Sequence, residues 1–132
     1  MGAILISNAM RFRPLWLAIG YALVAIIIFF SLAPDLPDTG IEQGDKLGHL
    51  IAYGTLMFWF CQLYATLRSR IAHALAFAAL GIALEYAQGM TDYRTFEVLD
   101  MLANATGVAL GWAIATLTGG ETLRRIERAL LR

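Results

Sequence analysis

Residues 85–104, EYAQGMTDYRTFEVLDMLAN, place carboxylates, amides and one arginine between two long apolar segments. Ionisable side chains are costly in hydrocarbon, and in membrane helices they normally face the protein interior or a wet cavity. The stretch therefore predicts two membrane helices joined by a polar loop, with the functional site beside that loop.

The whole chain has the composition of a membrane protein. Of its 132 residues, 59% are hydrophobic and 15% are charged, whereas soluble domains carry about 25% charged residues. A helix needs roughly 20 mainly apolar residues to cross a bilayer. Four blocks meet this requirement, at about residues 14–33, 46–66, 71–89 and 98–118. We expect one all-α membrane domain, residues 1–132, with four transmembrane helices in a bundle.

Charge is unevenly distributed, although the formal net charge is zero. The positive-inside rule assigns the side richer in Lys and Arg to the cytoplasm. Eight of the ten basic residues fall on one side of the blocks: Arg11, Arg13, Arg68, Arg70, Arg124, Arg125, Arg128 and Arg132. The other side carries the acids Asp35, Asp38, Glu42, Asp45, Asp92 and Glu97. The expected location is the cytoplasmic (inner) membrane, multi-pass, with the N- and C-termini inside.

Two segments are expected to be structural. The tail, residues 120–132, is amphipathic, with an apolar stripe at Leu123, Ile126 and Leu130 among arginines. This pattern is typical of a helix lying on an anionic inner leaflet. The first block carries no polar side chain beyond Ser31 in its outer part, and it is expected to be a lipid-facing scaffold.

The connections between the blocks are short, apart from the loop at residues 34–40, which contains two prolines. That loop either folds over the outer mouth of the bundle or is an exposed linker, and both interpretations stay open. Residues 66–70 are expected to form a tight cytoplasmic turn. The single cysteine, Cys61, is expected to be a small buried hydrophobic residue. A cleavable signal peptide is not expected, because no small-residue cleavage site follows Pro34.

Candidate site residues lie towards the outer ends of the second and third blocks. Asp45, His49 and Tyr53 recur at four-residue spacing and therefore share one helix face. Glu85 and Gln88 share a face of the third block. A single polar residue on an apolar helix face is often only a hydrogen-bonded residue of the core. Several polar residues at the same membrane depth indicate a functional site instead.

Further candidates lie in the next loop and block. Arg94 and Lys46 are the only cations on the acidic side. Arg94 is either the counter-ion of Glu85 or Asp100, or a fork for an anionic ligand. Asp100 alone is explained by helix capping, and Asn104 alone by an interhelical hydrogen bond.

The fourth block continues inward as a stripe of small residues. Gly107 and Gly111 form a Gly-x-x-x-Gly pattern, which lets membrane helices approach closely. We expect these two glycines to serve helix packing.

In combination, these motifs resemble those of the VanZ-like family of small bacterial membrane proteins. The resemblance covers about residues 12–118, and Leu50 stands where an aromatic residue is expected. The motifs are Asp45-Lys46-x-x-His49 with Tyr53, Glu85-x-x-Gln88, Arg94, and Asp100-x-x-x-Asn104-x-x-Gly107. The family is named for a protein associated with teicoplanin resistance. The resemblance therefore implies a cell-envelope role without fixing a reaction.

The leading hypothesis is a polar pocket at the outer membrane face that binds or processes an anionic envelope lipid or lipid-linked precursor. Arg94, together with Lys46, would hold a phosphate. Glu85, Gln88, Asp100 and Asn104 would shape the site and form hydrogen bonds in it. A link to glycopeptide resistance is one version of this hypothesis. Whether the protein is an enzyme stays open. The candidates for catalysis are His49, Glu85 and Asp100, since histidine exchanges protons near neutral pH.

The alternative is a structural or interaction protein whose polar cluster only holds the helices together. Interhelical hydrogen bonds contribute only about 0.6 kcal/mol on average to stability in membranes. Because this is a weak source of stability, the polar cluster favours the functional hypothesis over the structural one. A metal-dependent hydrolase is a weaker hypothesis, because no H-E-x-x-H or Cys/His spacing is present, and neither a metal nor a cofactor is expected. Nucleic acid is not expected as a partner, and a homo-oligomer is left open.

Overall fold

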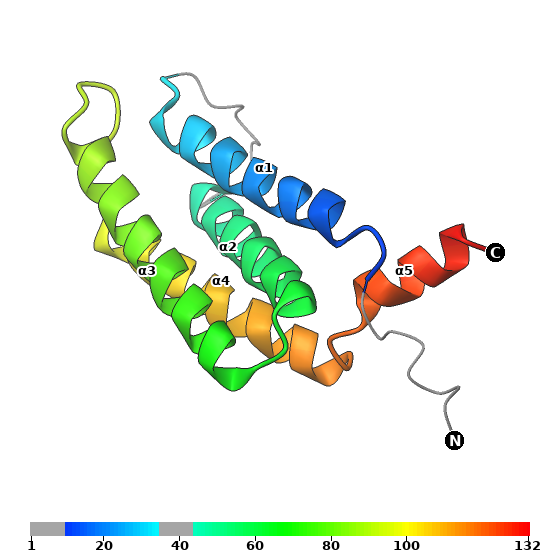
Figure 1. Ribbon diagram of the computed structural model, residues 1–132. Coiled ribbons are helices and arrows are strands. Elements are labelled where there is room, and N and C mark those ends of the chain that lie inside the picture. The colour runs from blue at the N-terminus through cyan, green and yellow to red at the C-terminus, as the bar shows by residue number, and fades with distance from the viewer. Residues whose placement is uncertain (1–9, 35–43) are drawn as a thin grey trace.

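The computed structural model describes residues 10–34 and 44–132, which form five α-helices and no strand within these ranges (Figure 1). The expected loop at residues 34–40 lies almost wholly outside them. The helices are α1 (Arg13–Leu32), α2 (Gly44–Leu63), α3 (Leu67–Gly89), α4 (Val98–Leu117) and α5 (Thr122–Leu130). The expected all-α class and the order of four long helices and a short last one are confirmed.

The start of α3 differs from the expected turn at residues 66–70. Thr66 is the N-cap of α3, and its side-chain oxygen accepts a hydrogen bond from the Ser69 backbone N–H at 3.2 Å. A threonine cap satisfies one of the free N–H groups at a helix start. The helix therefore begins at Leu67, four residues before the apolar block that predicted it.

Glycines end α4 and redirect the chain. Gly119 and Gly120 both have positive φ angles, 81° and 62°, which glycine adopts without a Cβ penalty. The Gly120 N–H donates to the Ala115 carbonyl at 2.8 Å and closes the helix end. The chain then turns into α5, which leaves the end of α4 in a new direction (Figure 1).

The helix α2 lies at the centre of the molecule and packs mainly against α4. Its side chains supply most of the hydrophobic core, including Tyr53, Leu56, Met57 and Phe60. Cys61 is buried there as well, as the sequence indicated. By length and hydropathy α1, α3 and α4 can cross a membrane, whereas α2 is not among the helices of the described chain that meet this criterion. The helix with the most contacts to its neighbours, α2, is thus more polar than α1, α3 and α4.

Glycines bring the backbones of α2 and α4 into contact. A Cβ added to Gly107 would lie 2.5 Å from the Leu50 carbonyl oxygen, and one added to Gly111 would overlap the Gly54 carbonyl oxygen. Backbone atoms cannot swing aside as a flexible side chain can. The close approach of α2 and α4 therefore requires glycine at both positions.

The helix α1 lies at the edge of the molecule, and α5 lies near the start of α1, at the end away from the turn between α3 and α4 (Figure 1). Large apolar side chains of α1 are exposed, for example Phe29 at 67%. On α5, Leu123 and Glu127 are buried, whereas Ile126 and Leu130 of the expected stripe are exposed. The buried face of α5 is therefore partly polar and packs on protein.

Glu127 connects α5 to the start of α1. Its carboxylate accepts hydrogen bonds from Trp16 Nε1 at 2.9 Å and from the backbone N–H groups of Phe12, at 3.2 Å, and Arg11. Partial desolvation acts to raise the pKa of Glu127, but these donors outweigh it and leave the pKa below its ordinary value. The tail helix α5 is thus hydrogen-bonded to the start of α1 through Glu127.

Candidate functional site

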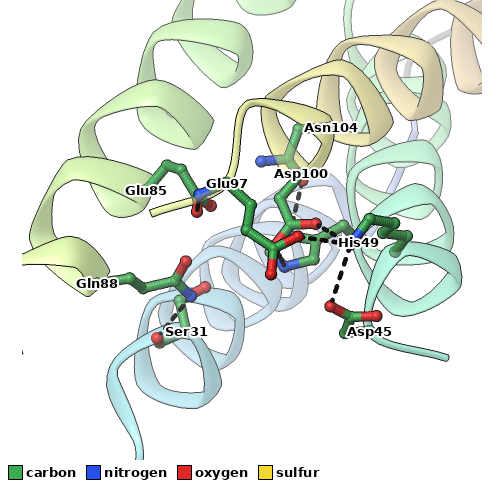
Figure 2. A network of polar contacts seen from close by, with 9 residues as sticks. Ser31, Asp45, His49, Glu85, Gln88, Glu97, Asp100 and Asn104 are labelled. Atoms are coloured by element: carbon green, nitrogen blue, oxygen red, sulfur yellow. Dashed lines mark hydrogen bonds and ion pairs between the residues drawn. The ribbon is translucent and has the colours of Figure 1, made fainter. Parts of the chain in front are cut away.

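Polar side chains gather where α2 and α4 begin and α3 ends (Figure 2). Glu85, Asp100 and Asn104 are at most 4% exposed, and they come from two helices, α3 and α4, that are long and apolar enough to cross a membrane. Because α2 and α4 both start at this end, residues of their first turns lie side by side. This geometry brings together five of the expected site residues: Lys46, His49, Glu85, Asp100 and Asn104.

His49 is held between two residues of α4. Its Nδ1 lies 2.9 Å from Asn104 Oδ1, and its Nε2 lies 3.6 Å from Asp100 Oδ2. An amide oxygen only accepts hydrogen bonds, so Nδ1 carries a proton. Nε2 therefore faces the Asp100 carboxylate, either with a second proton or with a free lone pair.

Lys46 is the counter-ion within the cluster. Its Nζ lies 2.7 Å from Glu97 Oε2, 3.3 Å from Asp100 Oδ1 and 3.5 Å from Asp45 Oδ2. Among the described residues, Arg94 forms no direct ion pair, so its expected role, as a counter-ion or as a fork for an anionic ligand, stays a prediction. Lys46 is the cation that contacts Asp100, because α2 and α4 start side by side.

Glu85 is almost fully buried, at 1% exposure. Its Oε1 accepts a 2.7 Å hydrogen bond from the backbone N–H of Glu97. Its Oε2 is buried and has no hydrogen-bond partner within residues 10–34 and 44–132. A buried acceptor left unpaired costs about 1–3 kcal/mol, so the native site tolerates a substantial penalty at this atom.

Two expected site residues form no hydrogen bond with this cluster within the described ranges. Gln88 donates from Nε2 to the Ser31 carbonyl oxygen of α1 at 2.8 Å (Figure 2). Tyr53 is buried in the hydrophobic core, and its hydroxyl has no hydrogen-bond partner in the described part of the chain. Gln88 therefore connects α3 to α1, and Tyr53 lies among core side chains.

A pocket of about 280 Å³ opens beside the cluster. Its wall consists of Pro34, Asp45, Tyr93, Arg94, Thr95, Glu97 and Asp100. Arg94 Nη1 is buried and has no hydrogen-bond partner among the residues that the structure covers. The pocket wall thus contains an arginine with one nitrogen that has no hydrogen-bond partner in the described part of the chain.

Sequence reasoning missed Glu97 as a site residue. It immediately precedes α4, its side chain pairs with Lys46 and its N–H binds Glu85. The signal was present, since Lys46 and Glu97 stand at the starts of the two blocks that begin on the same side. Thr95 and Pro34 carried no such signal.

The cluster also has donor atoms suited to a metal ion. One ligand atom each from His49, Glu85 and Asp100 lies within 4.8 Å of the others, and the same holds for Asp45, Glu97 and Asp100. The four carboxylates of the two sets outnumber the two permanent cations nearby, Lys46 and Arg94. The site is therefore acidic overall when His49 is neutral.

Comparison with known proteins gives a family and one relative without a described function. Residues 6–119 match the VanZ/LLP1 family model. An uncharacterized protein of Schizosaccharomyces pombe, C11E3.10, is 26% identical over 114 residues, which cover 84% of this chain and 68% of that protein. No solved structure matches the chain. With its long apolar helices and this match, the chain is a membrane protein that belongs to the VanZ/LLP1 family.

Proposed function

We propose that this protein binds the anionic headgroup of a membrane lipid, or of a lipid-linked envelope precursor, in the pocket beside Arg94. The pocket has room for a phosphate and its immediate substituents. Arginine forks suit phosphate because two parallel N–H groups match two oxygens. The proposed function is binding of the lipid headgroup. Whether the bound lipid is also chemically converted would be decided by looking for reaction products.

The single observation that carries the proposal is the state of Arg94. Its Nη1 is buried in the pocket wall and lacks a hydrogen-bond partner in the described chain, although several carboxylates lie nearby. A buried cationic donor is costly unless something accepts its hydrogen bond. An anionic oxygen in the pocket would remove that cost.

The proposal includes a placement in the membrane. All four long helices, α2 among them, would cross the inner membrane, with both termini in the cytoplasm and the pocket at the outer face. The polar side chains of α2 do not oppose this, because α1, α3 and α4 surround it and shield it from lipid. The arginines at the other end support the orientation by the positive-inside rule.

The relative in Schizosaccharomyces pombe supports one class of headgroup. A ligand shared between such distant proteins would be a general membrane phospholipid more readily than a bacterial cell-wall precursor. A role in teicoplanin resistance would require the second class. Comparing teicoplanin susceptibility of cells with and without the protein tests that narrower version.

The experiment compares Arg94→Gln with Arg68→Gln, an exposed arginine at the opposite end of the molecule. Protein in detergent is titrated with phosphatidylglycerol and with phosphatidylcholine, and bound lipid is counted by native mass spectrometry with EDTA present. We expect Arg94→Gln to weaken phosphatidylglycerol binding roughly tenfold or more, since a charged hydrogen bond contributes about 1.5–3 kcal/mol. Arg68→Gln should leave binding unchanged.

Two results would overturn the proposal. One is equal binding of both lipids by the wild-type protein. The other is an Arg94→Gln variant that binds as the wild type does. If Arg94→Gln also lowers the thermal midpoint of unfolding strongly, the structural alternative is favoured instead, in which the cluster only holds the helices together.

A further inference from the structure

We propose that His49, Glu85 and Asp100 form a divalent cation site for Mn²⁺ or Zn²⁺. The three residues come from α2, α3 and α4, and one donor atom of each lies within 4.8 Å of the other two. In Figure 2 their side chains converge from three helices on the same region. Small side-chain rotations bring such atoms to metal-ligand distances.

On each of the three residues one donor atom is held by a hydrogen bond or an ion pair from outside the set, and the other donor atom is not. His49 Nδ1 is bonded to Asn104 Oδ1, which directs the Nε2 lone pair of the neutral imidazole into the cluster. Glu85 Oε1 accepts the Glu97 N–H and leaves Oε2. Asp100 Oδ1 lies 3.3 Å from Lys46 Nζ and leaves Oδ2 facing His49.

This arrangement is the one that metal ligands require. A metal-binding histidine donates its other N–H to an oxygen, and ligating carboxylates are themselves hydrogen-bonded. Here Asn104, Glu97 and Lys46 supply those outer contacts. All three ligands are therefore oriented in advance.

Glu85 Oε2 is the observation that points most directly to a ligand. It belongs to a side chain that is 1% exposed, and it has no hydrogen-bond partner in the described chain. No cation of the described residues lies within ion-pair distance of Glu85. A metal ion between His49 and Asp100 would supply the missing contact.

The donor set selects the kind of ion. One imidazole nitrogen with two carboxylate oxygens suits Mn²⁺ or Zn²⁺, whereas Ca²⁺ prefers six to eight oxygen ligands. The second set, Asp45, Glu97 and Asp100, is not proposed, because Lys46 contacts all three of its carboxylates. Lys46 already acts as the cation there.

Three protein ligands leave coordination positions open for water or for an oxygen of a bound phosphate. That link between metal and headgroup rests on the proposed function, but the cation site itself does not. A divalent ion would also offset the excess of carboxylates and so strengthen the binding of an anion, which Arg94 alone already supports.

The test uses metal ions alone and no lipid. The full-length protein in detergent is stripped with EDTA, dialysed and titrated with MnCl₂ and, separately, ZnCl₂ by calorimetry. We expect one Mn²⁺ or Zn²⁺ per chain. Glu85→Gln and Asp100→Asn should each weaken metal binding by more than about tenfold, because even the loss of a residue that only contacts a metal ligand weakens metal binding by about that factor. The control Asp92→Asn removes an exposed acid of the neighbouring loop and should change nothing.

A spectroscopic measurement keeps the test decisive if those variants fail to fold. Pulsed electron paramagnetic resonance of Mn²⁺ bound to the wild type should detect one coordinating imidazole nitrogen, and His49→Gln should abolish that signal. Asn104→Asp should tighten binding, because a carboxylate is a stronger outer partner for histidine.

The proposal is overturned if the wild type binds neither ion stoichiometrically, if Mn²⁺ binds without a nitrogen signal, or if Asp92→Asn weakens binding as much as Glu85→Gln. Because lipid binding is measured with EDTA and metal binding without lipid, failure of one proposal does not imply failure of the other.

Discussion

The Glu97 backbone N–H donates a 2.7 Å hydrogen bond to Glu85 Oε1 across the turn that joins α3 to α4. This bond fixes the start of α4 against a buried carboxylate on α3. The same turn carries Arg94 and is tied to α1 by Tyr93, whose hydroxyl donates to the Leu32 carbonyl at 2.8 Å. The pocket wall thus depends on contacts to two helices.

The first prediction concerns this turn. Glu85→Ala removes the acceptor for the Glu97 N–H, so the turn should open more often and expose Arg94 to trypsin. We expect faster tryptic cleavage after Arg94 in folded protein, measured by mass spectrometry of timed digests. Ile82→Ala, an exposed position on the same helix, is the control. Equal cleavage rates in the two variants would show that the bond does not hold the turn.

The second prediction concerns the contact between α2 and α4. Gly111→Ala pushes a methyl group into the Gly54 backbone, and overpacking of this kind costs about 1–3 kcal/mol. Gly48→Ala, where nothing lies within 4 Å, should instead stabilise its helix by about 0.5–1 kcal/mol. Unfolding in detergent, followed by circular dichroism, measures both. A neutral Gly111→Ala would contradict the close approach.

The third prediction is a pH dependence at Glu127. Because the pKa of Glu127 is lower in the folded protein than its ordinary value of 4.5, its stabilising effect is complete above that value. The effect is lost as the pH falls through the folded pKa. The wild type should therefore lose more thermal stability than Glu127→Gln when the pH is lowered from neutral to well below 4.5. If Glu127→Gln loses as much thermal stability as the wild type over this pH range, the carboxylate of Glu127 does not have this effect.

The fourth prediction tests the orientation. Cys61 is 1% exposed, so the wild type should not react with a membrane-impermeant maleimide. Thr95→Cys should be labelled on intact cells, and Leu131→Cys only after permeabilisation. The reverse pattern, or labelling of both on intact cells, would exclude the proposed placement of the pocket at the outer face.

Much of the fold follows from the sequence because long apolar blocks have few alternatives. The start of α4 at Val98 was predicted at that residue, since the charged Glu97 precedes the block. The start of α3 was not, because the Thr66 cap adds a helical turn that contains polar residues. A hydropathy pattern predicts the apolar part of a helix, whereas the helix itself can begin earlier, as α3 does at Leu67.

The site was predictable in its position and less so in its partners. Spacing placed Glu85 and Gln88 on one face, but a face is wide enough for Gln88 to reach α1 while Glu85 reaches Glu97. Likewise, only the side-by-side starts of α2 and α4 make Lys46 the partner of Asp100. Such choices depend on which helices are neighbours, which the periodicity of one helix does not encode.

The position of α2 has a consequence for biosynthesis. This helix is more polar than its neighbours, yet it is the most enclosed, and its main contact, α4, is synthesised after it. We expect the nascent α2 to enter the bilayer inefficiently and to become stable there only when α4 arrives. Chains truncated before Val98 should therefore leave α2 uninserted, as glycosylation mapping would reveal. Insertion and folding of this protein would then be one concerted event.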